Sequence, residues 1–251
     1  MERSGRKLKT TVAGDALYQC AREILKVMEK TDSIMEDISE SCRGNLLLGA
    51  STIPGQYILP QYLKEFKDQY PNVNISMIVA DTENIFAQVA ERTLDIGVVG
   101  AKLQNRKVDC IQWTKDELVV LVPANHPLAS KEQVEFRELL GEKWVFREKG
   151  SGTRMATEEI LAQQGLGKDD LNIQMELGST EAVVAAIEAE MGVALASSYV
   201  VQQWIRRERV VSLRIAGGVA ARDIYVIYPK QRYRRKTVDN FLDFLRNSSN
   251  S

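Results

Sequence analysis

The chain has 251 residues, 44% of them hydrophobic, which is enough for one large core or two smaller ones. Its 33 lysines and arginines nearly balance 34 aspartates and glutamates, so no overall field favours nucleic acid or a membrane as partner. The three cysteines, Cys20, Cys42 and Cys110, lack CxxC spacing, which argues against disulfides and a zinc site. Because the sequence has no membrane-length apolar run and no secretory signal, we expect a cytoplasmic protein without a membrane partner.

Residues 1–12 form a basic end, with Arg3, Arg6 and Lys7 placed around Gly5. Two interpretations fit such a cluster. It is either a solvated chain end or a basic hairpin that touches phosphate groups.

A heptad pattern follows, in which apolar residues recur every three or four positions from Gly14 to Cys42. The repeat comprises Leu17, Ala21, Ile24, Met28, Thr31, Met35, Ile38 and Cys42. This spacing is typical of a coiled coil. A helix of about 28 residues is roughly 42 Å long, which is too long to bury within a small domain. We therefore predict a dimerising helix; a long helix packed along its own domain is the alternative.

The stretch from Gly44 to Met77 predicts a strand, a turn, a helix and a second strand, the unit of a parallel sheet. Ser51 and Thr52 stand directly after the first strand. Since ligands of open α/β sheets lie beyond the carboxyl ends of strands, these hydroxyls predict a ligand-binding turn.

The rest of the chain continues this alternation of strands and helices. Further strands are expected at 94–100, 111–113, 117–123, 144–147, 171–176, 192–196, 210–213 and 222–228, and helices at 84–92, 135–140, 152–164, 182–190, 198–206 and 238–245. The last strand and helix follow a completed second set, so we expect them to return to the first. The predicted organisation is a basic end (1–12), a helix (13–43), one lobe (44–122 plus 224–251) and a second lobe (123–223), with crossovers near 122 and 223.

The sequence contains few of the residue patterns that are typical of enzymes. The single histidine, His126, lies in a proline-flanked turn, without a GxSxG elbow. A glycine pattern at Gly150 fails because Met155 occupies the third glycine position of GxGxxG. Acidic pairs such as Asp116-Glu117 suit a solvated surface. We therefore expect no catalytic residue, no metal and no cofactor.

Hydroxyl-rich turns at four predicted helix starts are the remaining candidates for a site. Helix N-termini attract small anions, and a nearby arginine, Arg147, could pair with a carboxylate. Each turn alone could instead be a helix cap. The turns are Ser51-Thr52, Thr82, Ser151–Thr153 and Ser179-Thr180.

The sequence also resembles the LysR-type transcriptional regulators over nearly its whole length. The stretch ERSGRKLKTTVAGDALYQCAREIL resembles the family's wing and linker helix. The effector-binding region is similar in GNLLLGASTIPGQYILP, LDIGVVG, VPANHPLA, FREKGSGTR, LGSTEAVVAAIEAEMGVALAS and DIYVIYPK. The form STIPGQYILP is similar to members tied to sulfur, selenium or carbon-fixation genes.

This resemblance implies two Rossmann-like lobes of the type II periplasmic-binding-protein kind, with a small effector bound between them. It further implies a homodimer or homotetramer joined by the linker helix, with Leu17, Ile24, Met28, Met35 and Ile38 in the seam. The wing residues Arg3, Arg6 and Lys7 would lie near DNA phosphates. By position, the effector contacts would be Ser51, Thr52, Ile53, Thr82, Gly100, Arg147, Thr153, Ser179 and Thr180.

The family's winged helix-turn-helix would precede the wing, and its recognition helix is absent from this sequence. We therefore expect weak binding of promoter DNA by the chain as given. The leading interpretation is the effector-sensing and oligomerising part of a transcription regulator that binds a small anionic metabolite. A transporter's solute-binding protein of the same two-lobe architecture is the alternative.

Overall fold

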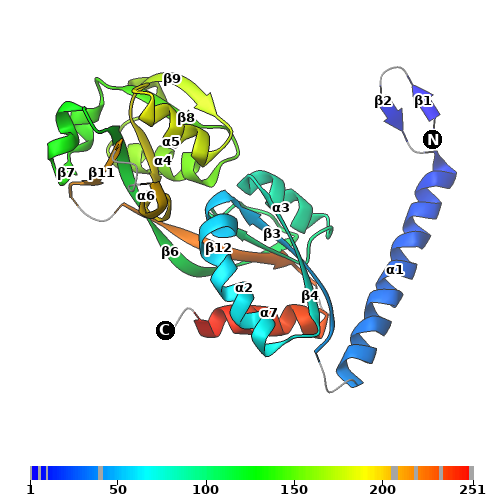
Figure 1. The fold of residues 1–251 in the computed structure, drawn as a ribbon. Helices are drawn as coiled ribbons and strands as arrows, with labels where there is room; N and C mark the ends of the chain where they lie inside the picture. The colour runs from blue at the N-terminus through cyan, green and yellow to red at the C-terminus, as the bar shows by residue number, and fades with distance from the viewer. Residues whose placement is uncertain are drawn as a thin grey trace.

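The computed structural model describes residues 2–4, 7–9, 11–38, 42–204, 209–217, 220–231 and 234–248. Figure 1 shows a small hairpin, a long helix and a two-lobed body. The hairpin pairs β1 (Glu2–Ser4) with antiparallel β2 (Lys7–Lys9), within the basic end for which the sequence left a solvated end or a hairpin open. Arg3 and Lys7 lie on its two strands, whereas Arg6 lies outside the described residues.

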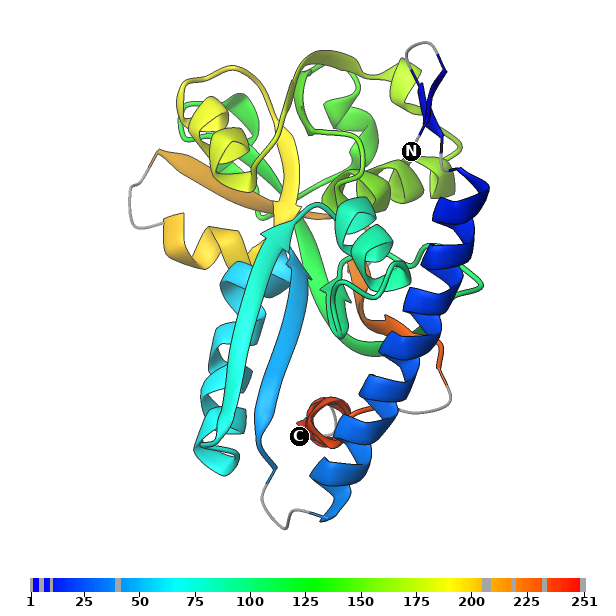
Figure 2. The same cartoon turned by 90° about the vertical axis from the view of Figure 1, so that its right-hand side faces the viewer.

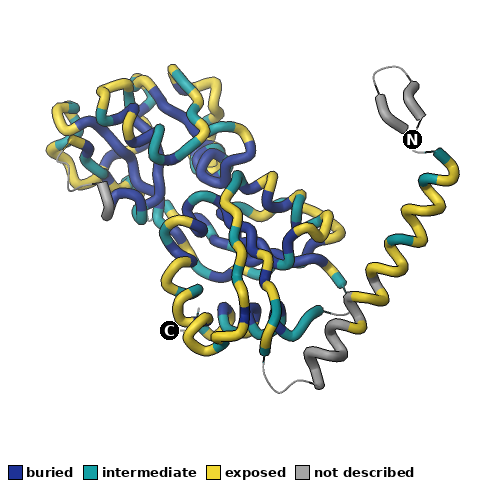
Figure 3. The backbone as a smooth tube through the Cα atoms, turned by 45° about the vertical axis from the view of Figure 1, so that its right-hand side comes forward, coloured by how far each residue is buried: buried dark blue, intermediate teal, exposed yellow. Residues whose placement is uncertain are grey.

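The long helix α1 (Val12–Ile38) extends away from the lobes but approaches α7 (Lys236–Ser248) of the first lobe, and Figure 3 shows the described residues of its N-terminal half as mostly exposed. The side chains of Leu17, Ile24 and Met28 are 71%, 60% and 57% exposed. Met35 and Ile38 also lie on α1, but their side chains are outside the described part of the chain. In this structure the predicted apolar seam is therefore uncovered along its described part.

The predicted helix is wrong at its end, because Cys42 is not part of α1. The helix ends at Ile38, and Cys42 lies half-buried against the main hydrophobic core of the body. Its Sγ atom lies 4.0 Å from Thr237 Oγ1 on α7. Because strand β3 (Gly44–Ser51) begins two residues later, the chain has already entered the body at residue 42, which removes this residue from the seam.

The first lobe is built on a sheet whose strands follow the order β4-β3-β5-β12-β6. β3 is parallel to β4 and β5, and β12 is antiparallel to β5 and β6. Figure 2 shows β3 and β4 side by side, with their C-terminal ends directed toward the second lobe. The strands are β3 (Gly44–Ser51), β4 (Val73–Ala80), β5 (Ile96–Val99), β6 (Val108–Pro123) and β12 (Ala221–Pro229), and the helices are α2 (Leu59–Gln69), α3 (Thr82–Ala90) and α7 (Lys236–Ser248).

A single long strand, β6, replaces the two strands predicted at 111–113 and 117–123. Its first half pairs with β12 as far as Glu117, opposite Ala221. The next residue, Leu118, pairs with Ser197 of β10 instead. The polar residues 114–117 do not break the strand because their backbones pair with β12. β6 therefore passes from one lobe into the other, and β12 makes the return, as the two-crossover prediction requires.

The second lobe contains the other half of β6, flanked by β10 (Ala194–Ser197) and β11 (Val210–Ile215). A short strand that the sequence did not predict, β7 (Gln133–Val134), pairs with β11, and the helix predicted at 135–140 is only a 3₁₀ turn. The remaining elements are the parallel strands β8 (Lys143–Arg147) and β9 (Asn172–Leu177), with the helices α4 (Gly152–Gln163), α5 (Thr180–Glu188) and α6 (Ser198–Trp204).

The apolar second half of β6 lies between two hydrophobic clusters. Because side chains alternate along a strand, Val119 and Leu121 join the main core, whereas Val120 and Val122 join a second-lobe cluster around Trp144. Burying one such side chain stabilises the fold by roughly 1.5–3 kcal/mol. Among the described helices, none combines the length and apolar character needed to cross a membrane.

Candidate functional site

The two lobes meet where β3 and β4 end in the first lobe and where β8 ends and α4 begins in the second. They enclose a cavity of about 10 Å³, roughly the space for the centre of one water molecule. The lining residues are Ser51, Thr52, Ile53, Asp81, Thr82, Arg147, Ser151, Gly152, Thr153 and Arg222. The structure thus brings together Ser51, Thr52, Ile53, Thr82, Arg147 and Thr153, which the sequence proposed from distant positions.

Glycine at position 152 allows the lobes to approach this closely. A Cβ atom on Gly152 would lie 2.8 Å from Thr82 Oγ1 and 3.1 Å from the carbonyl carbon of Gly100, both in the first lobe. A backbone hydrogen bond also crosses the boundary, from Glu83 N–H to Gly150 O at 3.4 Å. A ligand larger than a water molecule therefore requires these lobes to separate.

Arg147 is one of three charged residues that line the cavity, with Asp81 and Arg222, and only 5% of it is exposed. Its Nε and Nη2 atoms donate to the two carboxylate oxygens of Glu148 at 2.7 and 2.8 Å. Nη1 donates to Thr180 Oγ1 at 2.7 Å, and Nη2 makes a longer contact of 3.5 Å with Thr52 Oγ1 across the cleft. Glu148 thus fixes one edge of the guanidinium, and the other edge faces hydroxyls from both lobes.

The buried hydroxyls of Ser51 and Thr180, near Arg147, both use their oxygen atoms as hydrogen-bond acceptors. Ser51 Oγ accepts from Gly100 N–H at 3.1 Å, and Thr180 Oγ1 accepts from Arg147. A backbone N–H and a guanidinium only donate, so these oxygens keep their own protons available. Among the described residues, no group accepts those protons. Apart from the Asp81 carboxylate, which caps α3, these groups present hydrogen-bond donors, which suits a ligand that brings acceptors.

Thr82 is the residue that most directly indicates a missing partner. It begins α3, and its neighbour Asp81 caps the helix by accepting from Asn84 N–H at 2.8 Å. The Thr82 side chain is fully buried, yet its Oγ1 atom has no hydrogen-bond partner among the described residues. A buried hydroxyl without a partner costs about 1–3 kcal/mol, and a bound ligand would remove that cost.

The other predicted contacts, Gly100, Ser179 and Thr180, do not line this cavity. Gly100 adjoins it through its backbone bond to Ser51 Oγ, and Thr180 adjoins it through Arg147. Ser179 caps α5 by accepting from Ala182 N–H at 3.1 Å. Direct ligand contact by these three residues stays a prediction.

A buried ion pair beside the cavity was missed by the sequence analysis, which placed Asp116 on the surface. Asp116 is fully buried, and Arg222 is 7% exposed. Arg222 Nε and Nη2 lie 2.9 and 2.8 Å from Asp116 Oδ2, and Ser197 Oγ donates to Oδ1 at 2.6 Å. Burial and the charge of Asp116 raise the pKa of Tyr199 nearby. Sequence position was the one signal that could have revealed this pair, since Asp116 and Arg222 both lie near the predicted crossovers.

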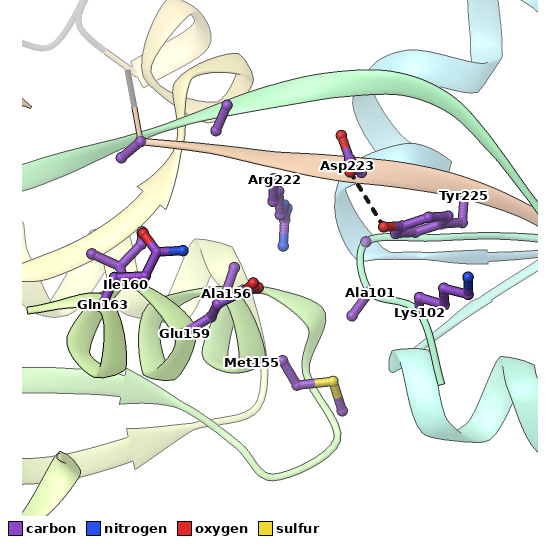
Figure 4. A pocket seen from close by; sticks show the side chains of 13 residues that line it. Ala101, Lys102, Met155, Ala156, Glu159, Ile160, Gln163, Arg222, Asp223 and Tyr225 are labelled. Atoms are coloured by element: carbon purple, nitrogen blue, oxygen red, sulfur yellow. Dashed lines mark hydrogen bonds between the residues drawn. The ribbon is translucent and has the colours of Figure 1, made fainter. Parts of the chain in front are cut away.

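Arg222 also lines a wider groove of about 400 Å³ between α4 and β12 (Figure 4). Ala101 and Lys102 lie across this groove from Met155 and Glu159 of α4. On the first-lobe side, burial and the carboxylate of Asp223 raise the pKa of Tyr225. Arg222 therefore stands between the small cavity and an open inter-lobe groove.

His126 occupies the turn predicted for it. Its Nδ1 atom accepts from Leu128 N–H at 3.2 Å, and its Nε2 atom lies 3.3 Å from Glu142. Neither residue lines the cavity. Within the described ranges, no group of His, Cys, Asp or Glu side chains is placed to hold a metal ion.

Comparisons with known proteins agree with this architecture. The family model described as LysR substrate binding domain matches residues 39–250. An uncharacterized HTH-type transcriptional regulator of Methanocaldococcus jannaschii is 32% identical over 94% of this chain and 79% of its own length. The HTH-type transcriptional activator CmpR of Synechocystis is 29% identical over 97% of this chain and 79% of its own length.

Among solved structures, the CcmR regulatory domain of Synechocystis PCC6803 in complex with 2-PG superposes with a TM-score of 0.74. It is 27% identical, and the match covers 82% of this chain and 98% of that domain. These relatives are transcriptional regulators. The chain belongs to the LysR substrate binding domain family, as the effector-binding region of a LysR-type regulator.

Proposed function

We propose that the cleft between the lobes binds a small anionic metabolite, and that binding changes the angle between the lobes. The observation that carries this proposal is the buried Thr82 hydroxyl, which has no hydrogen-bond partner among the described residues and belongs to a residue that lines the same cavity as Arg147, Ser51 and Thr153. Arginine and hydroxyl donors around one cavity suit a carboxylate or another oxyanion. The complex of the CcmR regulatory domain with 2-PG supports a small ligand on this fold.

The exposed apolar side chains of α1 support a second part of the proposal, a homodimer or homotetramer joined through this helix. Leu17, Ile24 and Met28 are each more than half exposed. Apolar residues at heptad spacing are stabilised by burial against a second helix. A change of lobe angle would then shift the balance between two arrangements of subunits.

Kinship with HTH-type regulators supports promoter DNA as the final target and the cytoplasm as the location. The basic residues of the β1–β2 hairpin, Arg3 and Lys7, would add salt-sensitive contacts with phosphate groups. The same kinship, together with α1, favours a regulator over a transporter's solute-binding protein and over an enzyme.

Thermal unfolding in the presence of 2-PG, inorganic phosphate or sulfate tests the cleft, with potassium chloride matched for ionic strength. A ligand at 100 times its Kd stabilises the fold by about 2.7 kcal/mol. For a chain of this length, that corresponds to a rise in Tm of roughly 5–10 °C. At least one of the three anions should produce such a rise.

Ser51→Ala and Thr153→Ala should remove the anion-induced rise. Each also loses one hydrogen bond of the free protein, worth about 1 kcal/mol. Thr157→Ala is the matched control, because its buried hydroxyl donates to Thr153 O on α4, outside the cavity. It should show a similar loss of stability and keep the rise. If the anion-induced rise in Tm were the same in Ser51→Ala, Thr153→Ala and Thr157→Ala, the proposed site would be contradicted.

A further inference from the structure

The ion pair between Asp116 and Arg222 joins the two strands that connect the lobes. Arg222 lies on β12, and Asp116 lies on β6. Both carboxylate oxygens are already occupied, Oδ2 by Arg222 and Oδ1 by Ser197 Oγ. The buried charge of Asp116 is therefore compensated without help from the cleft.

Arg222 makes a further hydrogen bond, which plays no part in its pairing with Asp116. Its Nη1 atom donates to Thr153 Oγ1 at 3.1 Å. Thr153 belongs to the first turn of α4 in the second lobe, and only 6% of it is exposed. Figure 4 shows Arg222 projecting from β12 toward α4. The bond thus runs from a crossover strand to a residue of the cavity.

The direction of this bond fixes the role of the threonine. A guanidinium has no acceptor, so the oxygen of Thr153 must accept, and its proton must point elsewhere. Among the described residues, no group accepts that proton, and Thr153 lines the cavity. With Arg222 in place, the hydroxyl is oriented to donate into the cleft.

We infer that Arg222 is a positioning residue for the effector site: it turns the Thr153 hydroxyl into a donor aimed at the anionic group of the effector. This inference rests on the proposed function. It makes the two crossover strands part of the site, because the group that orients Thr153 lies on β12 and is held by Asp116 on β6. Arg222 also borders the cavity, so direct contact with the effector is the competing explanation.

A double-mutant cycle separates the two explanations. The variants are Arg222→Lys, Thr153→Val and the pair of substitutions, and isothermal titration with 2-PG and with inorganic phosphate gives their affinities. Lysine keeps a positive charge beside Asp116. Its single ammonium group cannot reproduce the contacts that Nε and Nη2 make with Asp116 while Nη1 donates to Thr153. We expect each single variant to bind about tenfold more weakly, and the double variant to bind no more weakly than Thr153→Val.

Two further variants exclude a merely structural effect. Thr153→Ser keeps the hydroxyl and should bind within about twofold of the unchanged chain. Arg235→Lys alters an arginine of the first lobe that is paired with Asp95 and lies outside the cavity, and it should leave affinity unchanged. Melting temperatures of all variants report the stability change separately from affinity.

The outcomes are distinguishable. If the unchanged chain binds neither probe, the proposed function fails, and the role of Arg222 fails with it. If the chain binds but the losses from Arg222→Lys and Thr153→Val add, Arg222 contacts the anion itself, and only the positioning role is overturned. An affinity loss in Arg235→Lys equal to that in Arg222→Lys would overturn the positioning role as well.

Discussion

Thr82→Val should stabilise the free protein while it removes effector binding. Thr82 is fully buried, and its Oγ1 atom has no hydrogen-bond partner among the described residues. Valine has nearly the same shape and no polar atom, so the substitution removes the cost of a buried hydroxyl without creating a cavity. Asp81, rather than Thr82, caps α3 by accepting from Asn84 N–H, so the helix start is retained.

The magnitude follows from the cost of that hydroxyl. Mutational data place a buried polar group without a partner at about 1–3 kcal/mol. Taking about 1 kcal/mol, the expected increase in Tm is roughly 2–4 °C for a chain of this length. Urea denaturation of the ligand-free protein measures the gain in free energy of unfolding. The same experiment in saturating 2-PG or phosphate shows whether the variant has lost the stabilisation that the ligand gives the unchanged chain.

Thr157→Val is the control for this substitution. Thr157 is also buried, but its hydroxyl donates to Thr153 O at 2.9 Å, so the same chemical change should destabilise the fold by about 1 kcal/mol. If Thr82→Val instead lowered the stability of the ligand-free protein as much as Thr157→Val does, the Thr82 hydroxyl would already be satisfied. The reasoning that makes it a ligand group would then be refuted.

Three further substitutions or treatments test other parts of the structure. Met28→Glu should place a charge in the exposed seam of α1 and dissociate the proposed dimer; an unchanged mass by light scattering would remove the seam from consideration. Asp116→Ala should destabilise the fold by about 3–5 kcal/mol, because Arg222 is left buried without a counter-charge; a loss below about 1 kcal/mol in urea denaturation would show that the pair is not buried in solution. Burial raises the pKa of the Cys110 thiol, so at pH 8 iodoacetamide should label exposed Cys20 first, and equal labelling by mass spectrometry would contradict that burial.

Local patterns in the sequence were sufficient for most of the two-lobed framework. Apolar runs bounded by glycine or proline predicted the strands, and hydroxyl or acidic caps predicted the helix starts. Their order indicated that β12 and α7 return to the first lobe; in the structure β12 lies between β5 and β6, and α7 contacts β3 and α2. Ser51, Thr82 and Arg147 were placed near one site because strand ends and helix starts meet at one edge of such sheets.

Long-range pairing could not be predicted from the same patterns. Asp116 resembles a surface acid in the sequence because its neighbours are charged, yet pairing with β12 places it opposite Arg222 in the interior. The same pairing joins the two strands expected at 111–113 and 117–123 into β6. Cys42 fits the heptad spacing but leaves the helix, since the start of β3 draws the chain into the body.

The contacts between the lobes differ in strength along the cleft. At its rim, the bonds from Arg147 to Thr52 and from Glu83 to Gly150 are long, at 3.5 and 3.4 Å. At the crossovers, the contacts of Arg222 with Asp116 are charge-assisted and measure 2.8–2.9 Å. Arg147 also carries a charge, but its bond to the neutral Thr52 hydroxyl is at the limit of hydrogen-bond length, whereas Arg222 and Asp116 join two opposite charges at short distance. The lobes should therefore separate at the rim while the crossover pair stays intact, so that an anion enters beside Arg147 and meets a hydroxyl that Arg222 already orients.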